Sequence, residues 1–313
     1  MLPPLIRAKQ GDLNLVTSYG ITKDIYYESE EYIINRFLIV DGSNLLFQMF
    51  FGMPARIVNK RGKAIQGTLG FVGALLKIIR RIEPTHIVVL FDGEHENTRS
   101  ELNADYKANR VDYSQTLEEE TPFSQLPDVY AALAYLDIKF AETETCETDD
   151  WVAGYALTYG QETEIIISSF DSDFFQLITN KVSVLRYRGD STVICTPDYI
   201  KNKFSIEPQQ YADFKSLVGD TSDNIKGADK VGPKTAACLL NKFGTLDNIL
   251  VNAESIEKPS IRDSIIRNTE RLRTNYKIIK LNNTAQLPFA LNNLAYIFTG
   301  GTTTDVLNGI GLY

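Results

Sequence analysis

The sequence predicts an α/β protein with a mostly parallel sheet, followed by an all-helical region. Three continuous apolar runs, each closing on an aspartate, alternate with stretches of helical spacing in the first two thirds of the chain. This alternation is typical of buried parallel strands joined by helices. After Pro197 the composition changes to short amphipathic segments separated by short loops. We therefore expect two regions of different architecture.

The predicted strands and helices of the first region follow one another in order. The run FLIVD stays apolar up to its aspartate and then meets Gly42-Ser43, as a buried strand does where it enters a loop. The runs HIVVLFD and EIIISSFDSD repeat this pattern. The expected ranges are 37–41, 86–92 and 164–173 for the strands, and 68–82, 127–136 and 151–159 for the helices between and beside them.

The aspartates that close these runs, Asp41, Asp92 and Asp171, are expected to converge. In an open parallel sheet the carboxyl ends of the strands line one edge, and ligands bind in the crevice outside it. Each aspartate alone could equally be the cap of the helix that follows its strand. Three together favour a shared functional site.

Further carboxylates are expected beside this edge. Glu147, Asp149 and Asp150 lie at the start of the helix expected at 151–159, where one or two of them could serve only as caps, and Asp173 follows Asp171 by two residues. So many like charges raise one another's pKa unless cations neutralise them. An all-oxygen cluster favours Mg²⁺ or Mn²⁺, and two such ions can clamp the attacking and leaving oxygens of a phosphoryl displacement.

The segment from Leu217 to Ala237 combines two patterns. Asp220 and Asp223 are three residues apart, a spacing that places both carboxylates on one side of a helical turn. The glycine-punctuated stretch from Gly227 to Ala236 then leads into a helix that carries Lys234. Glycines allow close approach of the backbone, and amides at a helix N-terminus suit a phosphate. Each half alone is commonly an ordinary helix start or loop, but their adjacency favours a cation site beside a phosphodiester cradle.

A charged segment between the second strand and Glu147 offers cations. Lys107 and Arg110 are spaced to share one helical face, with Tyr106 beside them. Such cations could offset charge on a phosphate that is being cleaved. An exposed helix with ordinary surface charges explains the spacing equally well.

The helices of the second region are expected to be short. They are predicted at 198–204, 211–218, 233–243 and 246–250, with one or two longer helices at 259–281. Residues 1–36 show no sustained period and are interpreted as a peripheral extension, whereas 286–313 carry no recognisable chemistry.

Composition narrows the class of protein. No apolar run reaches the roughly 18–20 residues of a membrane span, and no signal-peptide core is present, so we expect a soluble cytoplasmic protein. The three cysteines lack paired metal spacing and the two histidines cannot build a histidine-rich centre, so any metal is expected to have oxygen ligands. The net charge of −8 argues against a nucleic-acid partner. This argument does not hold if many of the carboxylates gather in one metal site, because the rest of the surface is then close to neutral. Basic residues also cluster at 56–63, 226–234 and 262–280.

These motifs together resemble the bacterial and phage 5′ nucleases, the group that includes flap endonucleases and the 5′→3′ exonuclease domain of bacterial DNA polymerase I. The resemblance runs from about residue 37 to 287 and is closest to the small stand-alone bacterial exonucleases. It is carried by motifs that agree in order and spacing: IVDG at 39–42, LFD at 90–92, YKANR at 106–110, ETDD at 147–150, DSDFFQL at 171–177 and GDTSDNIKGADKVGPKTA at 219–236.

The resemblance implies a PIN-like nuclease domain with a helical arch, followed by a helical region with a helix-three-turn-helix DNA-binding motif at about 220–243. The implied domains are a 1–36 extension, a catalytic domain at 37–197, a DNA-binding region at 198–285 and a C-terminal segment at 286–313. The implied ligands of two Mg²⁺ or Mn²⁺ ions are Asp41, Asp92, Glu147, Asp149, Asp171, Asp173, Asp220 and Asp223, with Asp150 in an outer position.

The remaining implied roles concern the substrate. Lys107 and Arg110 fall where the family has cations that engage the scissile phosphate, and Tyr106 lies beside them as a DNA contact. Gly227, Gly232, Lys234 and Thr235 fall in the hairpin that holds duplex backbone, where the family can also bind K⁺.

The activity implied is metal-dependent 5′→3′ exonuclease or flap endonuclease cleavage of DNA by a monomer, at 5′ ends, flaps, nicks or branches, with RNA–DNA hybrids left open as substrates. Two alternatives remain from other classes. A non-catalytic DNA-binding protein would not need the full set of acids, and a metal-dependent phosphatase of small esters would not need the glycine hairpin.

Overall fold

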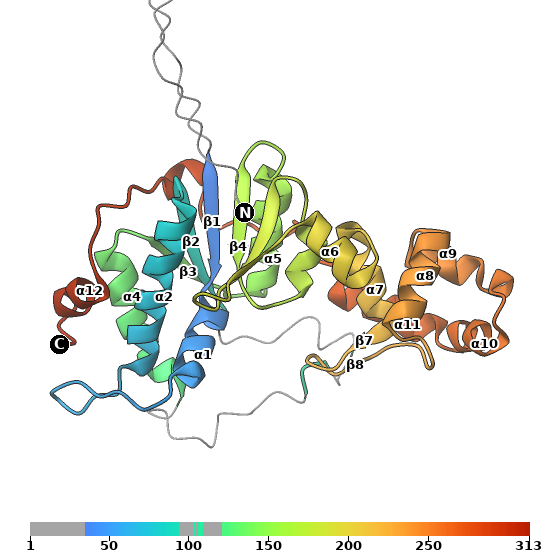
Figure 1. The fold of residues 1–313 in the computed structure, drawn as a ribbon, viewed down its shortest axis with the longest axis horizontal. Coiled ribbons are helices and arrows are strands. Elements are labelled where there is room, and N and C mark those ends of the chain that lie inside the picture. The colour runs from blue at the N-terminus through green and yellow to red at the C-terminus, as the bar shows by residue number, and fades with distance from the viewer. Residues whose placement is uncertain (1–34, 94–102, 104–105, 109–120) are drawn as a thin grey trace, which may run out of the picture. The chain divides into compact units, whose positions relative to one another are not determined.

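The computed structural model describes residues 35–93, 103, 106–108 and 121–313, which belong to one compact unit (Figure 1). All but the last two residues of the predicted 1–36 extension lie outside the described residues. No helix in the described part of the chain combines the length and the apolar character that crossing a membrane requires.

A six-stranded sheet with the order β3-β2-β1-β4-β5-β6 forms the centre of the unit (Figure 1). The strands from β3 to β5 pair in parallel, and β6 is antiparallel to β5. The strands are β1 Arg36–Asp41, β2 His86–Phe91, β3 Lys139–Glu142, β4 Glu164–Ser168, β5 Val182–Arg186 and β6 Val193–Cys195. The prediction of a mostly parallel sheet is therefore confirmed, and the carboxyl ends of β1, β2, β4 and β5 share one edge.

Helices cover both faces of the sheet, because side chains alternate between the faces along each strand. Leu38 and Val40 of β1 pack with α1, α2 and α4, whereas Phe37 and Ile39 point to the opposite face and pack with α5. The helices of this part are α1 Gly42–Gly52, α2 Gln66–Ile82, α4 Leu126–Tyr135 and α5 Thr148–Tyr159.

The all-helical region predicted after Pro197 is present. Its helices are α6 Pro197–Phe204, α7 Tyr211–Val218, α8 Pro233–Phe243, α9 Leu246–Val251, α10 Pro259–Arg267 and α11 Thr269–Ile279. The stretch predicted as one or two helices at 259–281 is thus two.

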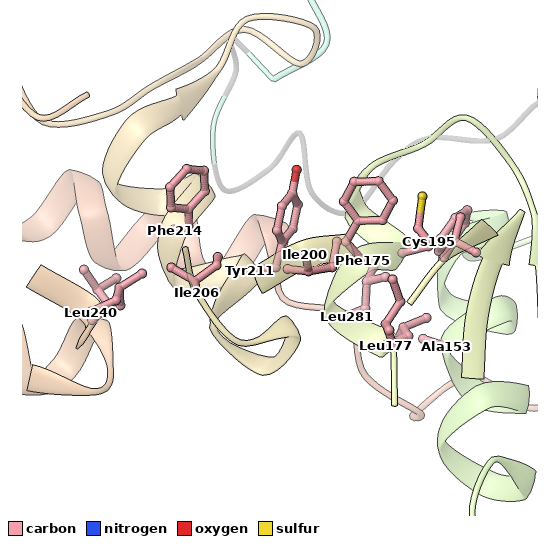
Figure 2. Packing of buried hydrophobic residues seen from close by; sticks show 14 of the residues in the cluster. Ala153, Phe175, Leu177, Cys195, Ile200, Ile206, Tyr211, Phe214, Leu240 and Leu281 are labelled. Carbon is pink, nitrogen blue, oxygen red and sulfur yellow. The ribbon is translucent and has the colours of Figure 1, made fainter. Parts of the chain in front are cut away.

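The helical region shares its core with one face of the sheet. Figure 2 shows buried side chains continuing from Ala153 of α5 through Phe175 and Tyr211 to Leu240 of α8. Since apolar contacts run across the predicted boundary at 197/198 without a break, burial in the core favours a fixed placement of α7 and α8 beside the sheet. The domain limits themselves stay predictions.

Three elements differ from the sequence-based expectation. β4 ends at Ser168, so Asp171 lies in the loop beyond the strand. Asp220 and Asp223 do not lie on a helical turn: Asp220 ends β7 Gly219–Asp220, and a turn leads from it to β8 Ile225–Lys226. The helix expected at 151–159 begins at Thr148, because Glu147 and Asp150 form its capping box.

The C-terminal segment adds a helix to the sheet domain. Helix α12 Thr303–Gly309 lies beside α2 and α4 (Figure 1). Its Val306 is buried against Val72, Leu76 and Ala132. The segment therefore completes the apolar packing of α2.

Candidate metal centre

The carboxyl edge of the sheet holds Asp41 and Asp171 in a chain of hydrogen bonds. Asp41 Oδ1 caps α1 by accepting from the Asn44 N–H at 3.0 Å, and its Oδ2 accepts from the Ser169 hydroxyl at 2.8 Å. Ser169 Oγ in turn accepts from the Asp171 N–H at 2.9 Å. Asp41 is therefore both a cap and a member of the shared site, and the two readings of the sequence are compatible.

Asp92 joins this group through the start of α5. Its Oδ1 accepts from the Thr148 N–H at 3.0 Å, and its own N–H donates to Ser43 Oγ at 2.9 Å. The N-terminus of α5 therefore faces Asp92, as suits an anion.

The acids at the start of α5 have mixed roles. Asp150 Oδ2 accepts from the Glu147 N–H at 3.3 Å, which is the reciprocal bond of the capping box. Glu147 is buried, and Asp149 and Asp150 are half-buried in the first turn. Glu147 and Asp150 thus act as caps while lying next to Asp92.

A second group of carboxylates forms next to the first. Asp173, Asp220 and Asp223 offer oxygens that all lie within 4.8 Å of one another. Asp173 is linked to the first group, because its N–H donates to Asp171 Oδ1 at 2.8 Å. The β7–β8 turn brings Asp220 and Asp223 together, although it is not helical.

Lys215 of α7 is a member of this second group that the sequence did not reveal. Its ammonium forms ion pairs with Asp173 and Asp220, and the three side chains are 8%, 10% and 11% exposed. Asp173 lies 42 residues away in the sequence, so local spacing contained no signal for this contact.

The pKa values reflect the crowding of like charges. Burial and the neighbouring charge of Asp92 raise the pKa of Asp41 to about 7. Burial disfavours the charged form of Lys215, but Asp173 and Asp220 outweigh it and raise the pKa of its ammonium above the usual value. Burial likewise opposes ionisation of Asp220, and Lys215 outweighs it and lowers the pKa of that carboxyl.

The donor set fits a hard divalent cation. The described ligand candidates are all carboxylates, which Mg²⁺ and Mn²⁺ prefer. The placement of the Lys215 ammonium between two buried carboxylates shows that this position favours positive charge. Burial and the charge of Asp92 oppose the ionised form of Asp41, so a bound cation would stabilise that form.

Lys107 reaches the same edge from outside the sheet. Its side-chain Nζ lies 2.5 Å from Glu147 Oε1, and its backbone N–H donates to the Asp223 carbonyl at 3.1 Å. It has φ 57, so it does not belong to the right-handed helical face that its spacing suggested. Arg110 lies outside the described residues.

Tyr106 has a packing role in the structure. Its side chain is 6% exposed and lies in a cluster with Ala212, Ile225 and Ile278. This packing anchors the backbone next to Lys107, and the DNA contact expected at this position stays a prediction.

The glycine stretch ends in an open helix terminus. A Cβ on Gly227 would lie 2.3 Å from the Leu217 carbonyl oxygen, so only glycine fits there. A Cβ on Gly232 would meet nothing within 4 Å, and this residue precedes α8 with no side-chain cap. Lys234 is exposed in the first turn and Thr235 is half-buried. The amides of α8 are thus accessible to a ligand.

A hollow of about 560 Å³ is lined by Asp220 of the second acidic group and by Gly227 of the glycine stretch. Its lining also includes Lys215, Asp229 and Arg271. Arg271 Nη2 also donates to the Gly227 carbonyl at 2.9 Å, so α11 braces this loop. One extended ligand can therefore contact both features.

Two family profiles match the chain over most of its length. The profile described as "5'-3' exonuclease, N-terminal resolvase-like domain" matches residues 36–205. The profile described as "5'-3' exonuclease, C-terminal SAM fold" matches residues 206–298.

Two curated relatives with similar sequences differ in length. The "5'-3' exonuclease" of Aquifex aeolicus (strain VF5) is 33% identical over 244 residues, which are 78% of this chain and 80% of that protein. The "DNA polymerase I" of Bacillus caldotenax is 31% identical over 265 residues, which are 83% of this chain but 29% of that protein. The chain therefore spans less than a third of the polymerase relative.

Solved structures share the fold. The T5 5′-exonuclease with bound zinc ions aligns with TM-score 0.65 and 21% identity over 78% of this chain and 89% of that one. The catalytic core of Rad2 in complex with DNA substrate aligns with TM-score 0.55 and 14% identity over 88% of this chain and 93% of that one.

Proposed function

The chain belongs to the 5′-3′ exonuclease family, and from this premise we propose that it is a metal-dependent nuclease that hydrolyses DNA phosphodiesters near 5′ ends or at flap junctions. The observation that carries the proposal is the meeting of two carboxylate groups at the edge of the sheet, with a hollow that extends from Asp220 to the start of the glycine stretch that precedes α8. Hard cations and a phosphodiester backbone are the ligands that these two features suit.

The acids would hold two Mg²⁺ or Mn²⁺ ions. Asp41, Asp92 and Asp171, with the acids at the start of α5, would serve one ion, and Asp173, Asp220 and Asp223 the other. Bound in this way, the ions supply Lewis-acid activation of water and charge neutralisation at the scissile phosphate.

The cations of the chain would bind and orient the substrate. Lys107, fixed next to Glu147, is proposed to meet the scissile phosphate together with Arg110. Gly227, Gly232, Lys234 and Thr235 are proposed to hold the duplex backbone, with K⁺ as a further ligand of this hairpin. The shared core supports a working unit of a 37–197 catalytic domain and a 198–285 DNA-binding region. We propose that it acts as a cytoplasmic monomer.

One cleavage assay tests the proposal. A 5′-labelled flap and a nicked duplex are incubated with the protein in Mg²⁺, Mn²⁺ or EDTA, and the same flap with an RNA strand tests hybrid cleavage. We expect products near the junction or the 5′ end with either metal and none with EDTA. Cleavage in EDTA, or no cleavage of any DNA with either metal, would refute the proposal.

A further inference from the structure

Two arginines lie against the aromatic ring that precedes Asp171. The guanidinium carbons of Arg186 and Arg188 are each 5.0 Å from the centroid of the Phe170 ring. Arg186 is the last residue of β5, and Arg188 lies in the turn between β5 and β6. Because β5 is parallel to β4, this turn lies at the same edge of the sheet as Asp41 and the other acids.

The backbone of Phe170 is held from both sides. Its N–H donates to Asn44 Oδ1 at 3.0 Å, and its carbonyl accepts from Arg186 Nη2 at 2.9 Å. Arg186 also lies 5.7 Å from the ring centroid of Phe175, which is fully buried in the core. The ring of Phe170 is therefore a fixed platform next to Asp171.

The turn that carries Arg188 is equally well defined. The Arg188 N–H donates to Thr192 Oγ1 at 3.0 Å, and the Thr192 hydroxyl donates to the Gly189 carbonyl at 2.6 Å. Gln48 of α1 donates to the Tyr187 carbonyl at 2.8 Å, which ties the turn to the sheet domain. The exposed guanidinium of Arg188 thus has a short, braced connection to the fold.

Arg188 differs from the other cations at this edge in its partners. Lys107 and Lys215 are each paired with a carboxylate, whereas Arg188 forms no ion pair with any carboxylate in the described ranges, including Asp190 of its own turn. Stacking on the ring restricts the guanidinium while its edge stays accessible. Such an edge binds a phosphate through two parallel hydrogen bonds.

We propose that Arg188, oriented by the ring of Phe170, binds a backbone phosphate of the DNA strand adjacent to the phosphodiester that is cleaved. This subsite rests on the proposed nuclease function. Arg186 positions the ring from the inner side, and Arg188 makes the contact with DNA. The contact is to the backbone, so it adds affinity for all sequences alike.

The test is a double-mutant cycle between Arg188 and single phosphates. Affinity for a 5′ flap is measured by fluorescence anisotropy in EDTA, where the metal-dependent cleavage is silent. Neutral methylphosphonates replace one phosphate at a time around the junction. On unmodified DNA we expect Arg188→Ala to weaken binding about tenfold and to reduce the salt slope by about one.

At the contacted position the two changes are expected to be non-additive. Wild type should lose affinity when that phosphate is neutralised, and Arg188→Ala should lose no more. Phe170→Leu keeps an apolar side chain but removes the ring, so it should weaken coupling at the same phosphate. Arg81→Ala is the matched control, because Arg81 is an exposed arginine in the last turn of α2, at the opposite edge of the sheet. Its loss should change neither the affinity for unmodified DNA nor the effect of neutralising any phosphate.

Two negative results have different meanings. If wild type binds and cleaves the flap but the changes are additive at every phosphate, the Arg188 subsite is wrong and the proposed function stands. If wild type neither binds nor cleaves DNA, the proposed function fails and this inference fails with it.

Discussion

Replacing Lys215 with methionine tests the electrostatics of the second acidic group in the protein without metal. The substitution keeps an apolar stem of similar length but removes the ammonium that pairs with Asp173 and Asp220. All three side chains are at least 89% buried, so solvent screens the lost attraction little. Removing one member of a buried ion pair costs about 3–5 kcal/mol. At about 2–4 °C per kcal/mol, we expect Lys215→Met to lower the melting temperature in EDTA by about 6–20 °C.

The same reasoning predicts how metal and pH change this loss. A divalent cation can replace the missing positive charge, so Mg²⁺ should raise the melting temperature of Lys215→Met more than that of wild type. Acidification should also narrow the difference in melting temperature between Lys215→Met and wild type. Without Lys215, burial raises the pKa of both carboxyls unopposed by that ammonium, so they lose their charge as the pH falls.

Differential scanning calorimetry in EDTA and in Mg²⁺, without DNA, measures these shifts. Lys201→Met is the control, since Lys201 is exposed and its ion pair with Glu207 is a surface contact; its melting temperature should not move measurably. The reasoning would be refuted if Lys215→Met melted like wild type in EDTA, or if Mg²⁺ stabilised both proteins equally.

Three further predictions concern metal binding, cleavage and DNA binding. Asp92→Asn or Asp171→Asn should abolish cleavage while leaving the melting temperature and DNA affinity in EDTA largely intact, because each removes a ligand charge and no core packing. Near-normal cleavage rates for both variants at low Mg²⁺ would contradict the metal site. The affinity for metal should decrease as the pH falls below about 7, by up to tenfold per pH unit for one proton, because Asp41 has a raised pKa and must release its proton to bind a cation. Calorimetric titrations of Mn²⁺ in buffers of different ionisation enthalpy would reveal that proton. An affinity that does not change with pH would exclude it. Lys234→Ala should weaken duplex affinity and lower the salt slope of binding by about one, with little change in the cleavage rate at saturating enzyme. Lys107→Ala should instead reduce the single-turnover cleavage rate by about 10²-fold, with little effect on DNA affinity.

The matched control for the last pair is Lys201→Ala, which should change neither affinity nor rate. If Lys107→Ala behaved like this control, Lys107 would be an ordinary charge of the site's rim and its pairing with Glu147 would have no catalytic consequence.

The sequence predicted the strands that are buried on both faces, because an unbroken apolar run is distinctive. It did not predict β3, whose four residues KFAE mix exposed and half-buried positions at the sheet edge, or the strands β5 and β6. It also missed α1, since GSNLLFQMFFG is apolar on most sides and shows no clear period.

The acids of the site were predictable, but their partners were not. Aspartates at strand ends can be recognised from spacing alone, and Asp41, Asp92 and Asp171 do meet. Ser169 and Lys215 were not recognised, because the contacts that join them to Asp41 and Asp173 span more than 40 residues of the chain. The helical interpretation of Asp220 and Asp223 was wrong because a three-residue spacing also fits a hairpin turn, where both carboxylates lie on one side.

The most direct test of the account is a titration with Mn²⁺ in which bound metal and cleavage are followed together. Free Mn²⁺ is measured by electron paramagnetic resonance, and single-turnover cleavage of a 5′-labelled flap is measured in the same solutions. We expect cleavage to rise as a second Mn²⁺ binds, and to stay absent in Asp173→Asn, which should retain one ion. Full cleavage with no bound Mn²⁺, or full cleavage by Asp173→Asn, would contradict the claim that the two carboxylate groups form a metal-dependent nuclease site.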